Sequence, residues 1–349
     1  MKPSFIYRAL EEVILSRHIL FDIEVSESGE QVVRWLRASG AEFWEPFFQM
    51  TVNRVVEKAQ RRMFLKTGSD ALFRQSSRRR CLYPSGFIFH IGRCGSTLLS
   101  NMIGATSRHF VLSEPHLPST AMLLDPKRCS PARWRELMRA GVLALGGVAP
   151  RSAERFFIKF FHGQTLALPL IREAVPRVPE AFVYRDPVEV TMSLLTTPSA
   201  SWFWHEYLTG LPVSAAVERP LVELAARMVG RTLQAMWSHV REDTVLLNYN
   251  EMGPETPGRL MSAWGLESDP DAERLAVQAL TIDAKDPVRR RKFIPDSDRK
   301  RNAATPYVRD VVATHALEPY LKLEGLRAAR VQSQSQPWQA PVPGPAATP

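Results

Sequence analysis

The 349-residue sequence has little cysteine and no long apolar run, and each absence excludes a class of protein. Its three cysteines, Cys81, Cys94 and Cys129, are odd in number and irregularly spaced, which argues against a disulfide framework and favours a reducing compartment. The eight histidines show no paired ligand spacing, so we expect no metal. No stretch reaches the roughly 18 apolar residues of a membrane helix, and charged residues interrupt the first twenty positions. We therefore expect a cytoplasmic protein without a membrane span.

The overall composition is typical of a globular protein with a basic surface. The sequence is 45% hydrophobic and 23% charged, enough to bury one large core or two modest ones. A formal net charge of +9 favours anionic partners such as nucleotides or sulfated and phosphorylated substrates. The arginine and lysine runs lack a recognisable reading helix or stacking platform, so nucleic-acid binding is not expected.

The first 80 residues differ in pattern from the rest of the chain. Ser28 is a candidate cap for a helical segment around residues 32–36, and helical spacing continues over 46–65. We therefore expect residues 1–80 to form a helical N-terminal extension. Residues 331–349, rich in proline, glutamine and alanine, are expected to form a disordered tail.

Between residues 86 and 330 short apolar runs alternate with helical patterns. Strands are expected at residues 87–91, 109–113, 155–161, 180–185 and 244–249. Strands that alternate with helices form a mostly parallel sheet covered on both faces. The sequence therefore predicts an α/β domain over 86–330, with three layers and a central, mostly parallel sheet.

The first of these strands runs directly into the segment Gly92-Arg93-Cys94-Gly95-Ser96-Thr97, and a helix follows at once. Glycines allow a tight turn and close approach to a ligand, and the N–H groups and dipole of a helix start favour an anion. Arg93 adds a fixed positive charge, and Ser96 and Thr97 add hydroxyls. The lysine of a nucleoside-triphosphate loop, GxxxxGK[ST], is missing. The segment predicts a P-loop-like cradle for a 5′-phosphate, although an ordinary strand-to-helix turn is an alternative.

A second segment, Arg185-Asp186-Pro187, leaves the strand expected at 180–185. Pro187 fits the first turn of a helix with Asp186 as its cap. Ser193 lies eight residues after Arg185, on a similar face of that helix. An arginine and a serine so placed can share one phosphate; the alternative is a capped surface helix with Arg185 in a salt bridge.

Together the two segments resemble the sulfotransferase family. The family's loop runs Pro-Lys-Ser-Gly-Thr-Thr or Pro-Arg-Ser-Gly-Thr-Thr, and its second motif is Arg-Asp-Pro with a serine eight residues after the arginine. Gly92 and Cys94 depart from the first motif. The positions that match the two motifs are Arg93, Gly95, Ser96, Thr97, Arg185, Asp186, Pro187 and Ser193.

The resemblance covers roughly residues 86–330 and implies a sulfotransferase that uses 3′-phosphoadenosine-5′-phosphosulfate as its donor. In the family, the loop holds the 5′-phosphosulfate and the second motif holds the 3′-phosphate. The resemblance thus implies donor contacts from Arg93, Cys94, Gly95, Ser96, Thr97, Arg185 and Ser193. A donor with two separate phosphate ends explains why two clusters are needed.

Two residues compete as the base that deprotonates the acceptor. Glu114 follows the strand at 109–113 and lies 21 residues after Arg93, a spacing similar to that of the tyrosylprotein and some bacterial sulfotransferases, which use a glutamate. His162 follows Lys159 in a segment similar to the family's Lys-Thr-His but one residue longer, and strand alternation puts the two on opposite faces. We expect Glu114 to be the base, and Lys159 with Arg93 to neutralise the transferring group.

Other features receive no firm assignment from the sequence. Tyr249 is expected to have a structural role, and the aromatic residues at 202–207 fit either an acceptor pocket or a buried helix. The acceptor, a small molecule or peptide with a hydroxyl or amine, and the oligomeric state are not specified. The family's basic loop over the 3′-phosphate has no single match among Arg289, Arg290, Arg291, Lys292, Arg299, Lys300 and Arg301.

Two other functions remain open. The first is a P-loop kinase-like phosphotransferase, against which the missing lysine and the second cluster argue. The second is a catalytically silent binding protein that keeps the sulfotransferase fold.

Overall fold

The computed structural model describes residues 15, 18–26, 28–37, 42–57, 64–77, 81–119, 122–123, 126–196, 208–217, 219–286, 288 and 290–335, and the statements below concern these. Within these ranges no helix combines the length and the apolar character needed to cross a bilayer. The basic run at 78–80, the aromatic segment 202–207 and Arg289 lie outside the described residues.

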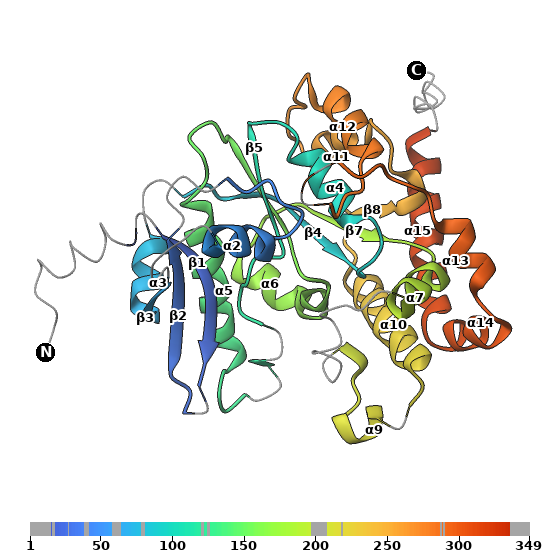
Figure 1. Cartoon of the computed structure of the whole chain (residues 1–349), viewed down its shortest axis with the longest axis horizontal. Helices are drawn as coiled ribbons and strands as arrows, with labels where there is room; N and C mark the ends of the chain where they lie inside the picture. Colours follow the sequence, from blue (N-terminus) through green and yellow to red (C-terminus); the bar gives the residue numbers. More distant parts are fainter. Residues whose placement is uncertain are drawn as a thin grey trace, which may run out of the picture.

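The N-terminal region is a three-stranded antiparallel sheet, so the expected helical extension is wrong (Figure 1). Its strands β1 (His18–Val25), β2 (Gln31–Arg37) and β3 (Phe64–Gly68) pair in the order β1-β2-β3. Helix α2 (Phe48–Glu57) connects β2 to β3, and α3 (Ser69–Ser76) follows β3. The helix expected over 46–65 is therefore correct only at α2.

The pattern in β2 explains the error. Val33 and Trp35 are buried, whereas Val32 and Arg34 between and beside them are half-buried, which is the two-residue period of a strand. β-Branched and aromatic residues also favour extended backbone. Ser28 lies in the turn between β1 and β2 and caps no helix, and Gly29, with φ of 80°, completes that turn.

The central sheet confirms the expected α/β fold. Five parallel strands pair in the order β5-β6-β4-β7-β8. The strands are β4 (Pro84–His90), β5 (His109–Ser113), β6 (Arg155–Lys159), β7 (Glu180–Tyr184) and β8 (Val245–Asn248). All five were located from their apolar runs, although β6 ends two residues earlier than expected.

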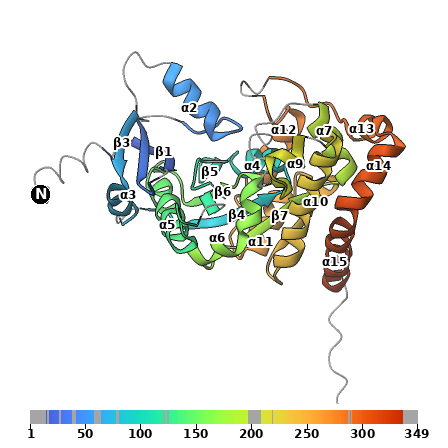
Figure 2. The same cartoon turned by 90° about the horizontal axis from the view of Figure 1, so that it is seen from below.

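Helices connect the strands and cover the sheet on both sides (Figure 2). Between the strands lie α4 (Ser96–Ile103), α5 (Pro131–Gly146), η2 (His162–Ala167), α6 (Leu168–Ala174), α7 (Pro187–Thr196), α9 (Val213–Val217) and α10 (Leu221–His239). After β8 come η4 (Tyr249–Glu251), α11 (Thr256–Ala263), α12 (Ala272–Thr281), α13 (Ser297–Ala303), α14 (Pro306–Val312), η5 (Ala313–Leu317) and α15 (Glu318–Ser335). The tail expected to be disordered from residue 331 is therefore helical through Ser335, and 336–349 lie outside the described residues.

Aromatic rings pack against one another at the centre of the sheet. The ring of Phe89 in β4 stacks on that of Phe160 at 5.0 Å and meets that of Phe182 in β7 edge-on at 6.2 Å. These side chains are fully buried, and each such burial stabilises the fold by about 1.5–3 kcal/mol. The same apolar cluster includes Ile19 and Trp35 of the N-terminal sheet. The carboxyl ends of β4, β6 and β7 are thereby fixed relative to one another.

Candidate functional site

The carboxyl ends of the parallel strands carry the residues that the sequence singles out. The phosphate loop (residues 92–97) follows β4, Glu114 follows β5, Lys159 ends β6, Arg185 follows β7 and Tyr249 follows β8. The connection after β4 runs to β5 and the connection after β7 runs to β8, so the direction of the connections reverses between these two neighbouring strands. Ligands of open α/β sheets bind in the crevice at such a point.

The phosphate loop has three residues with positive φ, and the space beside one of them admits only glycine. Gly95 caps α4 with φ of 86°, and a Cβ atom added there would lie 2.4 Å from Cδ2 of Tyr249. Arg93 also has a positive φ, 52°. The buried thiol of Cys94 donates to the carbonyl of Val183 at 3.2 Å, so its side chain points into the sheet. Cys94 therefore has only its backbone to offer an anion.

Glu114 shares this unusual backbone conformation, with φ of 56°. Among the described residues, the non-glycine positions with positive φ are Arg93, Glu114 and Arg177. Such conformations are costly for residues with a Cβ and cluster at functional sites. Two of the three lie at this edge of the sheet, which supports a functional role for both.

Glu114 and Lys159 form an ion pair in which the lysine is fully buried. Lys159 Nζ lies 2.7 Å from Glu114 Oε1 and 3.4 Å from Thr97 Oγ1. The Phe47 ring, just before α2, lies 4.7 Å from the same ammonium. A lysine in an apolar strand is rarely buried without an anionic partner, and Glu114 is that partner. The pair lies beside the start of α4, where the phosphate loop ends.

The surroundings keep Glu114 ionised. Removal from water by itself raises the pKa of its carboxyl, but the Lys159 ammonium and the nearby His90 ring outweigh this and hold the pKa well below its usual value. The side chain nevertheless keeps 23% of its surface exposed, so a ligand can reach it. Glu114 is thus an ionised, accessible carboxylate, and its Oε1 is the oxygen that faces Lys159 and His90.

His162 lies closer to this cluster than strand alternation implied. β6 ends at Lys159 and His162 opens η2, so the two-residue period no longer applies. Its ring lies 3.4 Å from the position of a Cβ on Gly92 and 6.1 Å from the His90 ring. Burial, reinforced by His90, lowers the pKa of His162 to about 3. A histidine with so low a pKa is a weak base at neutral pH.

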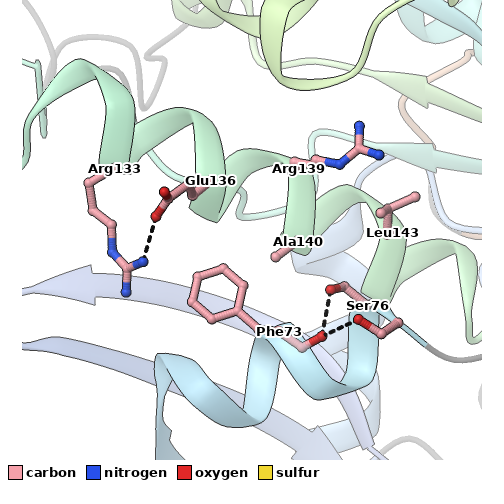
Figure 3. Close-up of a pocket in the computed structure, with 8 residues that line it drawn as sticks. Phe73, Ser76, Arg133, Glu136, Arg139, Ala140 and Leu143 are labelled. Carbon is pink, nitrogen blue, oxygen red and sulfur yellow. Dashed lines mark hydrogen bonds and ion pairs between the residues drawn. The ribbon is translucent and has the colours of Figure 1, made fainter.

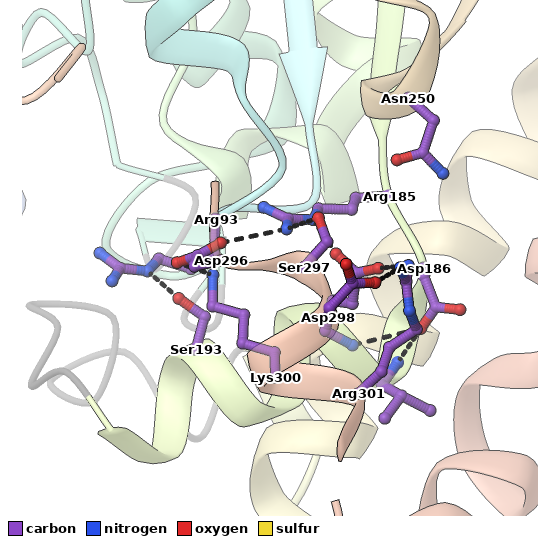
Figure 4. Close-up of polar contacts among 12 residues, drawn as sticks. Arg93, Arg185, Asp186, Ser193, Asn250, Asp296, Ser297, Asp298, Lys300 and Arg301 are labelled. Atoms are coloured by element: carbon purple, nitrogen blue, oxygen red, sulfur yellow. Dashed lines mark hydrogen bonds and ion pairs between the residues drawn. The ribbon is translucent and has the colours of Figure 1, made fainter. Parts of the chain in front are cut away.

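Arg185 is held by acidic and polar side chains from two elements (Figure 4). Its Nη2 lies 3.3 Å from Asp296 Oδ1 and 2.8 Å from Ser297 Oγ at the start of α13, and its Nε donates to Glu189 in α7. The Tyr249 ring lies 4.1 Å from the guanidinium carbon. Arg185 is therefore in ion pairs, as the alternative interpretation held, but the pair with Glu189 is buried and the pair with Asp296 is only partly exposed.

Ser193 was expected to share a phosphate with Arg185, yet its hydroxyl accepts instead from Nε of Arg93 at 2.9 Å. Arg93 and Ser193 point toward one another in Figure 4. The contact joins the phosphate loop to α7. Asp186 caps α7 as predicted, since its Oδ1 accepts from the N–H groups of Val188 and Glu189.

The segment after α12 brings two cations and one acid to this site. The sequence offered Lys300 only as one of seven candidates and did not point to Lys285 or Asp296. Lys300 Nζ lies 2.8 Å from Oδ2 of Asp296, the acid that also contacts Arg185. Lys285 lies in electrostatic reach of Arg93 and Lys159, and burial together with these cations lowers its pKa to about 8. No local pattern marks Lys285 or Asp296, because both reach the site through folding of a segment about a hundred residues from Arg185.

A groove elsewhere on the molecule contains none of these residues. It has a volume of about 630 Å³ and lies between α3 and α5 (Figure 3). Arg133 crosses it, 4.9 Å from the Phe73 ring and 2.6 Å from Glu136. Arg139, also in the lining, donates to the carbonyl of Ala174 at 3.1 Å, so the charged residues of the groove are bonded to other parts of the protein at the junction of α3 and α5.

No protein-family model and no curated protein sequence matches the chain. Its structure is similar to solved structures of sulfotransferases. The sulfotransferase domain of the Synechococcus PCC 7002 olefin synthase is 16% identical, with a TM-score of 0.42 over 73% of this chain and 97% of that domain. The sulfotransferase domain from the curacin biosynthetic pathway is 15% identical, with a TM-score of 0.42 over 67% and 98%.

Retinol dehydratase, solved with androsterone and the inactive cofactor PAP, is 13% identical, with a TM-score of 0.31 over 95% of this chain and 96% of that chain. These structural matches cover most of the chain at low sequence identity, and they include the family that the two sequence motifs resemble. Likeness this distant assigns neither reaction nor ligand, so the function follows from the residues above.

Proposed function

We propose that this protein transfers a sulfuryl group from 3′-phosphoadenosine-5′-phosphosulfate to a hydroxyl or amine acceptor. The observation that carries the proposal is the division of the site into two cationic groups at one sheet edge. Arg93 and Lys159 lie in electrostatic reach of Lys285 beside the phosphate loop, Arg185 and Lys300 meet at Asp296, and Arg93, which is also in electrostatic reach of Asp296, lies between the two groups. A donor with anionic groups at both ends of its ribose matches such a division.

At the first group, the donor's 5′-phosphosulfate fits the phosphate loop. Backbone N–H groups at the start of α4 and the positive end of its dipole favour an anion there. Arg93 and Lys285 add positive charge close by, and the burial that lowers the pKa of Lys285 makes an anionic ligand a favourable partner for it. We assign Lys159 to the sulfuryl oxygens, since its ammonium lies within 3.4 Å of the Thr97 hydroxyl in the loop.

At the second group, the carboxylate of Asp296 lies between the two cations that we assign to the 3′-phosphate. Asp296 is 29% exposed and its contacts with Arg185 and Lys300 are those that an anionic ligand would make. Partial burial raises its pKa, but Lys300 and Arg185 outweigh that and hold the pKa below its usual value. Ser193, next to Arg93, connects this group to the loop. The donor is expected to displace Asp296.

The chemistry assigned to this chain's residues is a single in-line displacement. The Glu114 carboxylate takes the proton of the acceptor O–H or N–H, and the acceptor atom forms the new bond to sulfur. The bond between sulfur and the bridging oxygen breaks, and the departing 3′,5′-bisphosphate keeps the electron pair. Lys159 and Arg93 stabilise the charge that gathers on the sulfuryl oxygens and on the leaving phosphate.

Donor binding also changes the base. While Lys159 is paired with Glu114, the carboxylate is a weak proton acceptor, because the ammonium stabilises its charge. Sulfuryl oxygens compete for the same ammonium, and its shift toward them raises the pKa of Glu114. The carboxylate therefore gains basicity when the donor is bound.

Calorimetric titration with adenosine 3′,5′-bisphosphate tests the donor assignment, with ADP as the ligand that lacks the 3′-phosphate. We expect the bisphosphate to bind tighter than ADP, and Arg185→Ala to weaken its binding by roughly 10–100-fold while leaving ADP unchanged. Arg135→Ala is the matched control, because Arg135 pairs with Glu173 on the outside of α5. Equal affinity for ADP and the bisphosphate would contradict the proposal.

Turnover distinguishes this reaction from the alternatives. Release of bisphosphate from the phosphosulfate donor is measured with a panel of phenols, alcohols and amines. Magnesium-dependent turnover of ATP without response to the phosphosulfate would instead indicate a kinase. Tight bisphosphate binding without turnover of any acceptor would favour a silent binding protein.

A further inference from the structure

A buried histidine lies between the phosphate loop and Glu114. His90 is the last residue of β4 and is 3% exposed. Its Nδ1 lies 2.9 Å from the backbone nitrogen of Gly92, and its Nε2 lies 2.8 Å from the carbonyl oxygen of Phe160. Nε2 also lies 3.6 Å from Oε1 of Glu114. One imidazole ring therefore contacts the segments that follow β4, β6 and β5.

These contacts determine which ring nitrogen carries the proton. The Gly92 N–H can only donate, so Nδ1 accepts; the Phe160 carbonyl can only accept, so Nε2 carries the hydrogen. Burial lowers the pKa of His90, Glu114 opposes this and Lys159 adds to it, so the net shift is downward. The ring is consequently neutral at physiological pH, with a defined tautomer.

We propose that His90 is a positioning residue that holds the phosphate loop and the base in register, an inference that rests on the proposed function. By accepting the Gly92 N–H, Nδ1 holds Gly92 and Arg93 in their positive-φ conformations, 76° and 52°. The remaining N–H groups of the loop are then free to face the anion. The ring acts through these neighbours and does not touch the reacting atoms.

The other side of the ring orients Glu114. Both Lys159 and His90 approach the same carboxylate oxygen, Oε1. Oε2 is therefore the oxygen that we assign to the acceptor proton. The carbonyl of Phe160 anchors the ring, because the Phe160 N–H is itself bonded to the Ile88 carbonyl of β4 at 3.0 Å.

The two contacts of His90 can be separated by substitution. The Oδ1 atom of an asparagine lies where Nδ1 lies and can accept from Gly92, but its side chain ends before Nε2. The amide nitrogen of a glutamine reaches the position of Nε2 and can donate to Phe160, but offers no acceptor to Gly92. His90→Asn and His90→Gln therefore each keep one function and remove the other.

The test measures bisphosphate affinity and the titration of the Glu114 carboxyl by ¹³C NMR in the full chain. We expect His90→Gln to weaken adenosine 3′,5′-bisphosphate binding roughly tenfold, the loss of about one hydrogen bond, and His90→Asn to preserve it within about twofold. His90→Asn should instead raise the pKa of Glu114. His109→Asn is the matched control. His109 is also a buried histidine, with Nδ1 2.8 Å from the Ile103 carbonyl, but it is the first residue of β5 and so lies at the amino ends of the strands, away from the site.

Several outcomes overturn the inference. If both His90 variants lower thermal stability as His109→Asn does, yet leave the affinity and the Glu114 titration unchanged, His90 is only structural. ¹⁵N NMR of the wild-type ring needs no variant, and a proton on Nδ1 would contradict the proposed contacts. If the wild-type protein binds the bisphosphate no better than ADP, the proposed function is wrong. The ¹⁵N NMR signal of the His90 ring and the titration of Glu114 would still test the role of His90.

Discussion

The two ends of the candidate site are built differently. The end at the phosphate loop is assembled from strand ends: Glu114, Lys159 and His90 lie on or beside β5, β6 and β4, and backbone hydrogen bonds tie those strands together. The end around Arg185 is completed by α13, and an acid of the protein's own, Asp296, lies among its cations.

The contrast indicates which part of the site is preorganised. Groups that stabilise a transition state act best when their positions are fixed before the reaction, because no reorganisation is then needed. A group that only retains the donor can exchange one anionic partner for another. We therefore expect the large losses of turnover at the strand-built end, whose loop also binds the donor, and changes in affinity alone at the helix-built end.

The largest effect is expected from Glu114→Gln, which keeps the shape of the side chain and removes its charge. Turnover of the phosphosulfate should fall by roughly 10²–10⁴-fold with little change in bisphosphate affinity, because the loss is that of a general base. Glu154→Gln is the control. Glu154 pairs with Arg108 just before β6 begins, at the amino ends of the strands and away from the site. If His162→Ala causes the large loss and Glu114→Gln does not, the base is His162.

Gly95→Ala should have the next largest effect, on binding. The new methyl group would lie 2.4 Å from the Tyr249 ring, on a backbone with positive φ. Strain of this kind should weaken bisphosphate binding by roughly tenfold or more. Gly265→Ala isolates the steric part, because Gly265 also has positive φ but no atom within 4 Å of the added Cβ. Calorimetry and thermal unfolding of both variants measure the difference, and equal behaviour would exclude a special role for Gly95.

The strand-built end is also the end that the sequence predicts best. Buried parallel strands are continuous apolar runs, so 109–113 and the other four were found directly, and their order along the chain places Arg93, Glu114, Lys159 and Arg185 at carboxyl ends. The N-terminal strands are only partly buried, and the pair Trp35-Leu36 within β2 breaks strict alternation, which favoured a helix by mistake.

Residues brought in by the C-terminal segment carry no such signal. Lys285 and Asp296 look like members of a solvated charge run until the fold places them beside Arg93 and Arg185. His90 was hidden for another reason: within the apolar run 87–91 it has the pattern of a core residue, and only the geometry of its ring nitrogens reveals two specific contacts.

Lys285 gives a smaller effect that depends on pH. In the free protein its pKa is about 8, lowered by burial and by Arg93 and Lys159, with Glu114 opposing and Lys300 adding to the shift. A bound anion raises that pKa, so binding takes up a proton once the pH exceeds 8. Affinity for the bisphosphate should then fall by roughly tenfold between about pH 7 and pH 9.

Calorimetry in buffers of different ionisation enthalpy measures this proton uptake directly. Lys285→Met should bind more weakly at neutral pH and lose the uptake above pH 8. The matched control is Lys322→Met, because Lys322 pairs with Glu318 on the exposed face of α15. Uptake that persists in Lys285→Met would assign the titration to another group.

The smallest effect, with the opposite sign, is expected at the helix-built end. Asp296→Asn removes a negative charge 3.3 Å from Arg185 and 2.8 Å from Lys300, so a 3′-phosphate no longer has to displace a competing anion. Affinity for the bisphosphate should rise by about three- to tenfold, the value of one partly exposed ion pair, while affinity for ADP stays the same. Asp298→Asn, on the same helix but 89% exposed, serves as the control. Weaker binding in Asp296→Asn would mean that Asp296 orients Arg185 for the ligand, and both ends of the site would then be preorganised.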